Sequence, residues 1–434
     1  MRSTRSLFLL CCLPLLVLVA VSGQAFAAIV AVGTCTNLVN FATIQLAVNS
    51  VPAGSTIQIC PGTYPEQVTI NKKLTLEGIA TAAGDAAVIL PPTTGMVQNT
   101  VDVDDPSLPI AAQVLVQNTS GPVKISNLTV DATANGITGC APDLQGILFQ
   151  SATGTLNHVA VRNQTLGVGL GGCQSGESIF VQSAAGLFSV VTVEDSSVHN
   201  YNKNGITGND PGTTMTVTGN YVQGAGVVPV PGAAQNGIQL GFGARGKISA
   251  NTVIDNIYGD PTTAASADIL LYDTAESSGV MVTTNIVGNS QLPIVLYTDF
   301  AYGPTEFGDG VSVTGNKIFG TATYDAIDVC TNGNTVTGNT IFNSAESGVH
   351  LDASCGTFFG GPATGNNNTA TGDTFLESAC AGILADPGTT GNNYITPSDT
   401  YYTVPFPVTS STSSCAIPSG HAGARAAHKF SPAR

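Results

Sequence analysis

Two short apolar motifs recur along the chain and stay in phase with each other. The first is Val or Ile followed by Thr or Ser before a turn, as in Val217-Thr-Gly-Asn220, Ile248-Ser-Ala-Asn251 and Val313-Thr-Gly-Asn316. The second is a small residue before an apolar alternation, as in Gly146-Ile-Leu-Phe149 and Gly237-Ile-Gln-Leu240. Alternation with a period of two over a few residues is typical of a short β-strand. The pattern therefore predicts many short strands joined by turns.

The spacing of the first motif predicts how these strands are arranged. From Asn127 to Asn393 it recurs over nine intervals and 266 residues, which is about 30 residues for each unit. A unit this small cannot bury its own apolar side, but stacked units share a continuous core. Hairpin turn signals are sparse, and a propeller would need blades of four antiparallel strands. We therefore predict an all-β solenoid, with the recurrent Asn bonding to backbone groups of neighbouring coils at an inward turn.

The beginning of the repetitive region points to a known family. It contains Thr43-Ile-Gln-Leu-Ala-Val-Asn49, Pro61-Gly-Thr-Tyr64 and Leu74-Thr-Leu-Glu-Gly78. Together with the Val-x-Gly-Asn-x-Ile turn, these motifs resemble the right-handed parallel β-helix, or pectin-lyase-like, superfamily over residues 40–397. The resemblance implies a right-handed parallel β-helix of about ten to twelve coils behind a short N-terminal capping helix. Catalytic and non-catalytic members share these motifs, so they specify the fold and leave the activity open.

The two ends of the chain differ from the repetitive body. Arg2 and Arg5 precede the apolar stretch Leu7–Val21, and Ala25-Phe-Ala27 is a small-x-small cleavage site, which together are typical of a signal peptide. We predict a signal peptide at 1–27, the β-helix at 28–397, and a Ser/Thr/Pro-rich, then basic, tail at 398–434. No later segment reaches 18 uninterrupted apolar residues, so we expect an exported protein without membrane insertion, located extracellularly, in a periplasm or on the cell surface.

The charge balance limits the possible partners. Two of the 13 basic residues lie in the signal peptide, which leaves 11 against 28 acidic residues, a formal net charge of −17. Such a surface repels nucleic acid and anionic lipid, so we expect neither as a partner. It would also repel an acidic polysaccharide unless a cation such as Ca²⁺ bridged the two.

Eight cysteines remain after the signal peptide, an even number that indicates disulfides in an exported chain. We favour pairing between neighbours in sequence, although eight cysteines allow 105 connectivities. The predicted pairs are Cys35 with Cys60, Cys140 with Cys173, Cys330 with Cys355, and Cys380 with Cys415.

The catalytic motifs of the resembled family are mostly incomplete. The chain lacks the Trp and the Gln-Asp pair of pectinesterases, and no Asp-Pro is followed by the His of alginate-type epimerases. Arg162 and Arg245 are the only body arginines that could serve as the base of a lyase. Thr323-Tyr-Asp325-Ala-Ile-Asp328 and Glu346-Ser-Gly348 resemble two of the four polygalacturonase motifs, but Ala381 stands where that family has His.

Alignment of the repeats on their Ile or Val gives a more specific candidate site. Equivalent outward positions of successive coils lie about 4.8 Å apart, so acids and aromatic rings should gather on one face. Carboxylates can transfer protons and rings can stack on pyranoses, which is what a polysaccharide site requires. The catalytic candidates are Asp325, Asp328, Glu346, His350 and Asp352, and the substrate-binding candidates are Tyr272, Asp273, Tyr297, Asp299 and Tyr302.

Two acidic loops are candidates for Ca²⁺, which prefers clustered hard oxygen ligands. They contain Asp102-Val-Asp104-Asp105 and the set Asp299, Glu306 and Asp309. Two functions then remain for the whole chain. The acidic and aromatic face favours a secreted polysaccharide hydrolase or lyase. The incomplete family motifs favour a non-catalytic exported solenoid that binds glycans or contributes to the cell surface.

Overall fold

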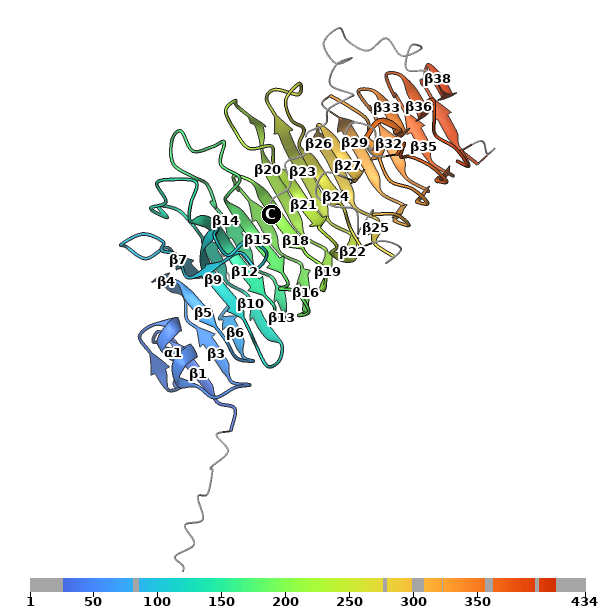
Figure 1. The fold of residues 1–434 in the computed structure, drawn as a ribbon. Helices are drawn as coiled ribbons and strands as arrows, with labels where there is room; N and C mark the ends of the chain where they lie inside the picture. The colour runs from blue at the N-terminus through green and yellow to red at the C-terminus, as the bar shows by residue number, and fades with distance from the viewer. Residues whose placement is uncertain are drawn as a thin grey trace, which may run out of the picture.

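The computed structural model describes residues 26–80, 86–275, 279–298, 308–321, 323–355, 362–394 and 398–410. These residues wind into a solenoid in which three long sheets run from one end of the molecule to the other (Figure 1). The sheets contain 13, 12 and 13 strands, and we call them sheets A, B and C in that order. Every strand pairing except that of β8 with β9 is parallel. The predicted right-handed parallel β-helix is therefore confirmed.

Each coil contributes one short strand to each sheet. Sheet A contains β1 (Ile29–Val32), β2 (Asn40–Phe41), β3 (Thr56–Ile59), β6 (Thr75–Gly78), β10 (Val123–Ser126), β13 (Thr153–Asn157), β16 (Ser189–Glu194), β19 (Thr213–Thr218), β22 (Arg245–Ser249), β25 (Met281–Thr283), β28 (Ser312–Thr314), β31 (Thr335–Thr337) and β34 (Thr369–Thr371). Sheet B contains β4 (Gly62–Pro65), β7 (Ala87–Leu90), β11 (Thr129–Asp131), β14 (Ala160–Arg162), β17 (Ser197–His199), β20 (Tyr221–Val228), β23 (Thr252–Tyr258), β26 (Ile286–Ser290), β29 (Lys317–Thr321), β32 (Thr340–Phe342), β35 (Thr374–Leu376) and β37 (Thr400–Tyr402). Sheet C contains β5 (Val68–Ile70), β8 (Thr100–Val101), β9 (Pro109–Gln117), β12 (Asp143–Gln150), β15 (Glu177–Gln182), β18 (Asn204–Asn209), β21 (Asn236–Gly241), β24 (Ala267–Tyr272), β27 (Leu292–Tyr297), β30 (Ile327–Val329), β33 (Ser347–Leu351), β36 (Ala381–Ala385) and β38 (Phe406–Thr409).

The predicted capping helix is α1 (Ile44–Ser50), at the N-terminal end of the solenoid (Figure 1). It begins after Thr43, whose hydroxyl accepts the backbone N–H of Leu46 at 3.1 Å, as a helix N-cap does. Its apolar face joins the core of the first coils. Within the described residues, no helix is long and apolar enough to span a bilayer.

The core is a set of stacked columns of apolar side chains. In sheet C the register pairs Ile269 with Ile294, Ile294 with Ile327, and Ile327 with Val349. All of these residues are fully buried and belong to the single main core. Because equivalent residues lie about 4.8 Å apart, each coil extends the same column and the core is continuous.

The small residue before the repeated Ile is explained by a close approach between coils. A Cβ added to Gly146 would lie 2.4 Å from the carbonyl oxygen of Ser178. At Gly205 and Gly237 the corresponding distances to carbonyl oxygens of the next coil are 2.5 and 2.6 Å. Real Cβ atoms do not approach backbone oxygens this closely, so these three positions require glycine.

An asparagine ladder joins five successive coils through Asn220, Asn251, Asn285, Asn316 and Asn339. The Oδ1 atom of Asn285 accepts the backbone N–H of Asn251 at 3.0 Å, and its Nδ2 donates to the carbonyl of Ile248 at 3.0 Å. The other members repeat these bonds. The predicted structural role of the repeated Asn is therefore confirmed.

Two of the predicted repeat positions differ from the ladder. Asn127 and Asp195 have φ values of 55° and 49°, so they are left-handed turn residues that precede the ladder position. In two early coils the ladder position is occupied by Leu128 and Val159, which pack in the core. Early coils are thus joined by apolar packing where later coils use hydrogen bonds.

Three predicted disulfides are confirmed, namely Cys35–Cys60, Cys140–Cys173 and Cys330–Cys355. Cys380 is also disulfide-bonded, but its predicted partner Cys415 lies outside the described residues, as does nearly all of the predicted signal peptide. Strands β37 and β38 extend sheets B and C beyond residue 397, so the described solenoid continues to Thr409.

The ladder gives a direct stability prediction. Asn285→Ala leaves the buried N–H of Asn251 and the carbonyl of Ile248 without partners, so we expect a loss of about 2–4 kcal/mol in the free energy of unfolding. Asn49→Ala on the exposed side of α1 is the control, with a change below about 0.5 kcal/mol. Denaturant unfolding followed by circular dichroism measures both. Equal stability of the two variants would contradict the role of the ladder.

Candidate functional site

Sheet C brings two ionisable residues of the predicted site side by side. The register pairs Asp328 in β30 with His350 in β33. Their strand neighbours Ile327, Val329 and Val349 point into the main core, so Asp328 and His350 lie on the outer face of the sheet. Alignment of the repeats predicts this result, because it places Asp328 and His350 at the same outward position of successive coils.

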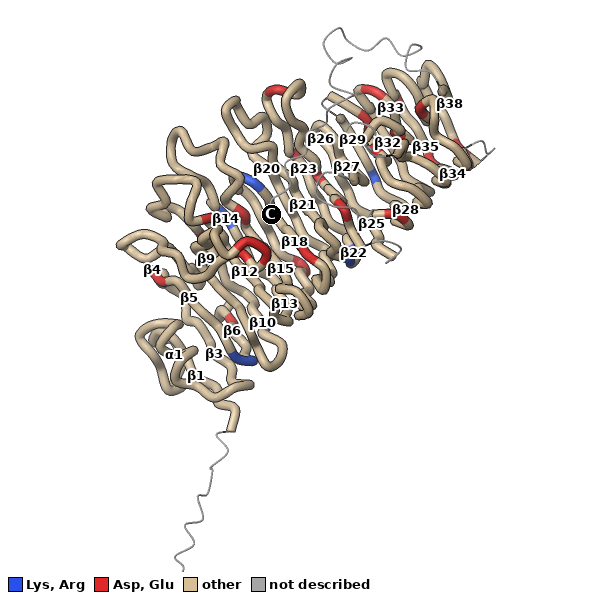
Figure 2. Tube along the Cα trace, in the orientation of Figure 1, with Lys and Arg blue, Asp and Glu red and all other residues tan. Residues whose placement is uncertain are grey.

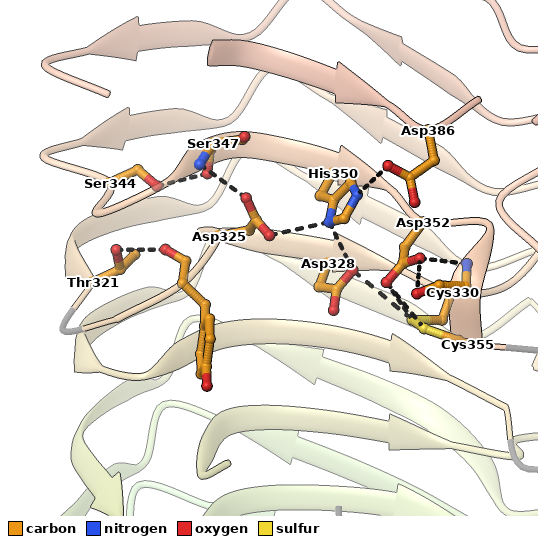
Figure 3. A network of polar contacts seen from close by, with 12 residues as sticks. Thr321, Asp325, Asp328, Cys330, Ser344, Ser347, His350, Asp352, Cys355 and Asp386 are labelled. Carbon is orange, nitrogen blue, oxygen red and sulfur yellow. Dashed lines mark hydrogen bonds and ion pairs between the residues drawn. A yellow bond between two sulfur atoms is a disulfide. The ribbon is translucent and has the colours of Figure 1, made fainter. Parts of the chain in front are cut away.

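His350 lies at the centre of the group shown in Figure 3. Its Nδ1 is 3.1 Å from Asp325 Oδ2 and 3.8 Å from Asp328 Oδ1, and its Nε2 is 3.2 Å from Asp386 Oδ1. The other oxygen of Asp325 accepts the backbone N–H of Ser347 at 2.8 Å. A carboxylate at each nitrogen favours the charged imidazolium, which can donate from both atoms.

Asp352 completes the group, which we call the His350 cluster: Asp325, Asp328, His350, Asp352 and Asp386. Asp352 Oδ1 accepts the backbone N–H and the hydroxyl of Ser354 at 2.5 and 2.6 Å. Its Oδ2 lies 3.3 Å from Cys355 Sγ, which carries no proton because it forms the disulfide with Cys330. This contact is therefore van der Waals packing, and one oxygen of Asp352 has no donor at the disulfide.

Burial and charge move the pKa values of the cluster in opposite directions. Burial, and then the charge of Asp352, raise the pKa of Asp328 well above its usual value, and burial also raises that of Asp352. Burial alone would raise the pKa of Asp386, but the hydrogen bond and charge of His350 lower it. Burial alone would lower the pKa of His350, but the charges of Asp325 and Asp352 raise it well above 6.5. These opposite shifts favour a protonated Asp328 beside an ionised Asp386.

Access to the cluster is uneven. The side chains of Asp328, Asp325 and His350 are 0%, 2% and 4% exposed, whereas that of Asp386 is 13% exposed. Asp328 Oδ2 is buried without a hydrogen-bond partner in the described structure. Among these side chains, the solvent thus contacts mainly Asp386.

Asp328, His350 and Asp352 are close enough to share a cation, since their ligand atoms lie within 4.8 Å of one another. A protonated imidazole has no lone pair for a metal, however, and both of its nitrogens already face carboxylates. The disulfide also removes Cys330 and Cys355 as thiolate ligands. As it stands, the geometry suits proton transfer better than metal binding.

Tyr272 and Tyr297, the aromatic candidates that lie within the described residues, do not present an open ring face to a sugar. Tyr272 and Tyr297 stack on each other with centroids 5.6 Å apart and are only 0% and 3% exposed. They belong to a second apolar cluster on the outer side of sheet C, together with Tyr324, whose hydroxyl donates to the carbonyl of Pro261 at 2.5 Å. The sheet is covered on both faces here, so outward positions are buried.

The other candidates have different outcomes. Glu346 is 8% exposed and acts electrostatically on Tyr324, whose pKa is raised by burial and then by Glu346. Asp273 is a buried left-handed turn residue with a φ of 46°. Asp309 accepts the backbone N–H of Asn332 at 2.7 Å. Asp299, Tyr302 and Glu306 lie outside the described residues, so the calcium loop remains a prediction.

One member of the cluster was absent from the predicted site. Asp386 follows β36 and occupies the position three residues after Ile383, which is the column that contains Asp352. The alignment of equivalent positions therefore places Asp386 in the same column as Asp352. The hydrogen bond between Asp386 and His350 is visible only in the structure.

The state of His350 can be tested directly. Because its pKa is raised, we expect its imidazole to stay protonated at pH 7 and to titrate only above its ordinary value of 6.5. Nitrogen-15 NMR of the five histidines measures this, and the His350→Gln variant assigns the resonance. A neutral ring at pH 7 would contradict the bonding described for the cluster.

Comparison with known proteins identifies the fold. No protein-family model matches the sequence, and no curated protein matches it. A GH136 lacto-N-biosidase from Eubacterium ramulus has a TM-score of 0.55 at 10% identity, covering 88% of this chain and 67% of its own. The catalytic domain of a GH87 alpha-1,3-glucanase with bound nigerose has a TM-score of 0.50 at 12% identity, covering 88% and 68%. The mannuronan C-5 epimerase A-module from Azotobacter vinelandii has a TM-score of 0.43 at 13% identity, covering 85% and 94%. The first two likenesses agree with the right-handed parallel β-helix fold described above.

Proposed function

We propose that this chain is an exported glycoside hydrolase that cleaves a neutral polysaccharide at the His350 cluster. The observation that carries the proposal is the pair of carboxyl groups with opposite pKa shifts, Asp328 raised and Asp386 lowered, on the two sides of one imidazolium. Glycoside hydrolysis requires this combination, because one carboxyl must donate a proton while the other is ionised.

In this proposal each side chain has a role. Asp328 is the general acid, and Asp386, which contacts solvent, is the base that activates water. Their strands lie two coils apart, about 10 Å along the solenoid, and the two carboxyl groups contact opposite nitrogens of the His350 ring. His350 holds Asp386 ionised through its hydrogen bond, and Asp325 and Asp352 hold His350 charged.

The electrostatics favour hydrolysis of a neutral glycan over elimination from an acidic one. The cluster contains four carboxyl groups and one imidazolium, so it repels a uronic acid. Basic residues are few along the solenoid (Figure 2), and Arg162, a conceivable lyase base, is bound to Asp131 at 2.8 Å. The two similar structures with TM-scores of 0.55 and 0.50 are named as glycan-cleaving enzymes, which is the class proposed here. The confirmed disulfides support export.

Substitution of the two proposed catalytic residues tests the site. Reducing-sugar release from a panel of neutral polysaccharides identifies the substrate, and Asp328→Asn and Asp386→Asn should each lower its turnover by about 10²–10⁴-fold. Asp328→Asn replaces a protonated carboxyl by an amide of similar shape, so the fold should be retained. Asp260→Asn, in an exposed turn, is the matched control and should keep turnover within about twofold of the parent. Unchanged turnover and affinity in both site variants would leave the alternative, a non-catalytic glycan-binding solenoid.

The pH profile tests the assignment of acid and base separately. Activity should fall on the alkaline side of the profile as Asp328 loses its proton. Because the pKa of Asp328 is raised, this fall should occur at a pH above the ordinary pKa range of a carboxyl group. The acidic limb of the profile should lie at a pH below the usual pKa of an Asp side chain, because the pKa of Asp386 is lowered. Measurement of kcat across pH gives both limbs, and Asp386→Asn should abolish the acidic one. A profile whose alkaline limb falls at an ordinary carboxyl pKa would reject Asp328 as the acid.

A further inference from the structure

Apolar side chains follow one another along the outer face of sheet B, where strands β23, β26, β29, β32 and β35 lie side by side (Figure 1) and β37 continues the sheet. The register pairs Phe319 with Phe342, Phe342 with Leu376, and Leu376 with Tyr402. Ile341, the strand neighbour of Phe342, is buried in the main core, so Phe342 and its column point outward. We call the outward apolar residues of these six strands the sheet B strip: Ile254, Ile286, Phe319, Phe342, Leu376 and Tyr402.

The strip is continuous although its column contains one glycine. Ile254 pairs with Gly288, and Gly288 pairs with Phe319. Ile286, two residues before Gly288 in β26, is the diagonal neighbour of both Ile254 and Phe319. Long side chains at diagonal positions of a sheet are within reach of each other. The strip therefore runs over six coils, which is about 24 Å along the solenoid.

The large side chains of the strip are open to solvent. Ile286, Phe319, Phe342 and Tyr402 are 41%, 39%, 44% and 56% exposed. Single exposed apolar residues are common on protein surfaces, but a contiguous row of them marks a contact surface. Sheet C differs, because there the outward rings of Tyr272 and Tyr297 are covered.

The fold itself does not require apolar residues on an outer face. In the same coils, sheet A has hydroxyl side chains in one outward column, where the register aligns Thr283, Thr314, Thr337 and Thr371. Both sheets consist of short parallel strands with the same step, so threonine would also suit the positions of the strip. The apolar side chains of sheet B therefore indicate a partner rather than a need of the solenoid.

The strip is also almost without charge. In the two outward columns of these six strands, Lys317 is the only charged side chain. Asp255 and Glu377, which follow Ile254 and Leu376, are left-handed residues with φ values of 67° and 59° at the edge of the strip. The whole chain has 28 acidic and 13 basic residues, so two copies repel each other over most of their surfaces. The strip is a place where a second copy can approach without this repulsion.

The size of the face is that of a weak protein interface. Six strands about 4.8 Å apart and about 17 Å long present about 500 Å². Two such faces together bury about 1,000 Å², which is the lower limit for a specific interface. Aromatic residues are enriched at the centres of interfaces, and the strip contains three. Small ligands bind mainly in concave sites, so an open sheet face suits another sheet better than a sugar.

We propose that the sheet B strip is the contact face of a homodimer, in which the strip of one copy packs against the strip of a second copy. Two sheets packed face to face lie about 10 Å apart, with their side chains interdigitated. A two-fold axis brings the same surface of both copies together, so one apolar strip is sufficient for both halves of the interface. The His350 cluster lies on sheet C, so the dimer does not rest on the proposed hydrolase.

Sedimentation equilibrium of the mature chain tests the proposal at protein concentrations from about 1 μM to 1 mM, the range of weak affinities. We expect a reversible equilibrium between monomer and dimer, and a Kd that rises tenfold or more in Phe342→Ser and in Phe319→Ser. The apolar contact has to overcome the repulsion between two acidic chains. Raising the NaCl concentration from about 0.05 to 0.5 M should therefore lower the Kd of the parent protein.

The control is Phe188→Ser, which truncates a phenylalanine that is 71% exposed in the turn before β16, outside the strip, and should keep the Kd within twofold. Circular dichroism checks that each variant is folded. A parent protein that is monomeric at every concentration, or strip variants that dimerise like the parent, overturns the proposal. Retention of a monomeric parent on an insoluble neutral polysaccharide, lost in Phe342→Ser and kept in Phe188→Ser, would also overturn it by assigning the strip to a glycan. Failure of the hydrolase proposal appears separately, as unchanged turnover in Asp328→Asn and Asp386→Asn.

Discussion

The parallel register between successive coils is the constraint on which the rest of the structure depends. Because each strand pairs with its equivalent one coil away, every position becomes a column with a step of about 4.8 Å. Along these columns, apolar residues form a continuous core, glycine permits close backbone contact, and asparagine joins coils by hydrogen bonds. A residue in this fold is therefore selected mainly by the residues above and below it.

The same constraint produces the unusual electrostatics of the His350 cluster. Register places Asp328 directly beside His350 of the next coil. Covering the outer face of sheet C then removes water from these side chains, so protons redistribute among them. A covered parallel sheet thus converts an ordinary alternation of polar residues into groups with shifted pKa values.

The sequence was informative wherever register decides the outcome. The repeat period and the pairing of Asp328 with His350 follow from equivalent positions in neighbouring coils, and the three disulfides were predicted from the pairing of neighbouring cysteines in the sequence. The exposure of the outward side chains could not be predicted in this way. The alternation along a strand indicates which side of the sheet Tyr272 faces, but it does not indicate whether other residues cover that side.

The chemistry at the end of the asparagine ladder differs from that of its middle. After Asn339 the ladder position passes to Asp373, and the N–H of Asp373 is accepted by Asp399. Each ladder asparagine both accepts a backbone N–H and donates to a carbonyl of the preceding coil. An ionised carboxylate accepts hydrogen bonds but cannot donate one, so at Asp373 the bond to the preceding coil is missing. The exchange of an amide for an acid thus leaves the C-terminal coils joined through acceptors alone, whereas the middle of the solenoid is joined in both directions.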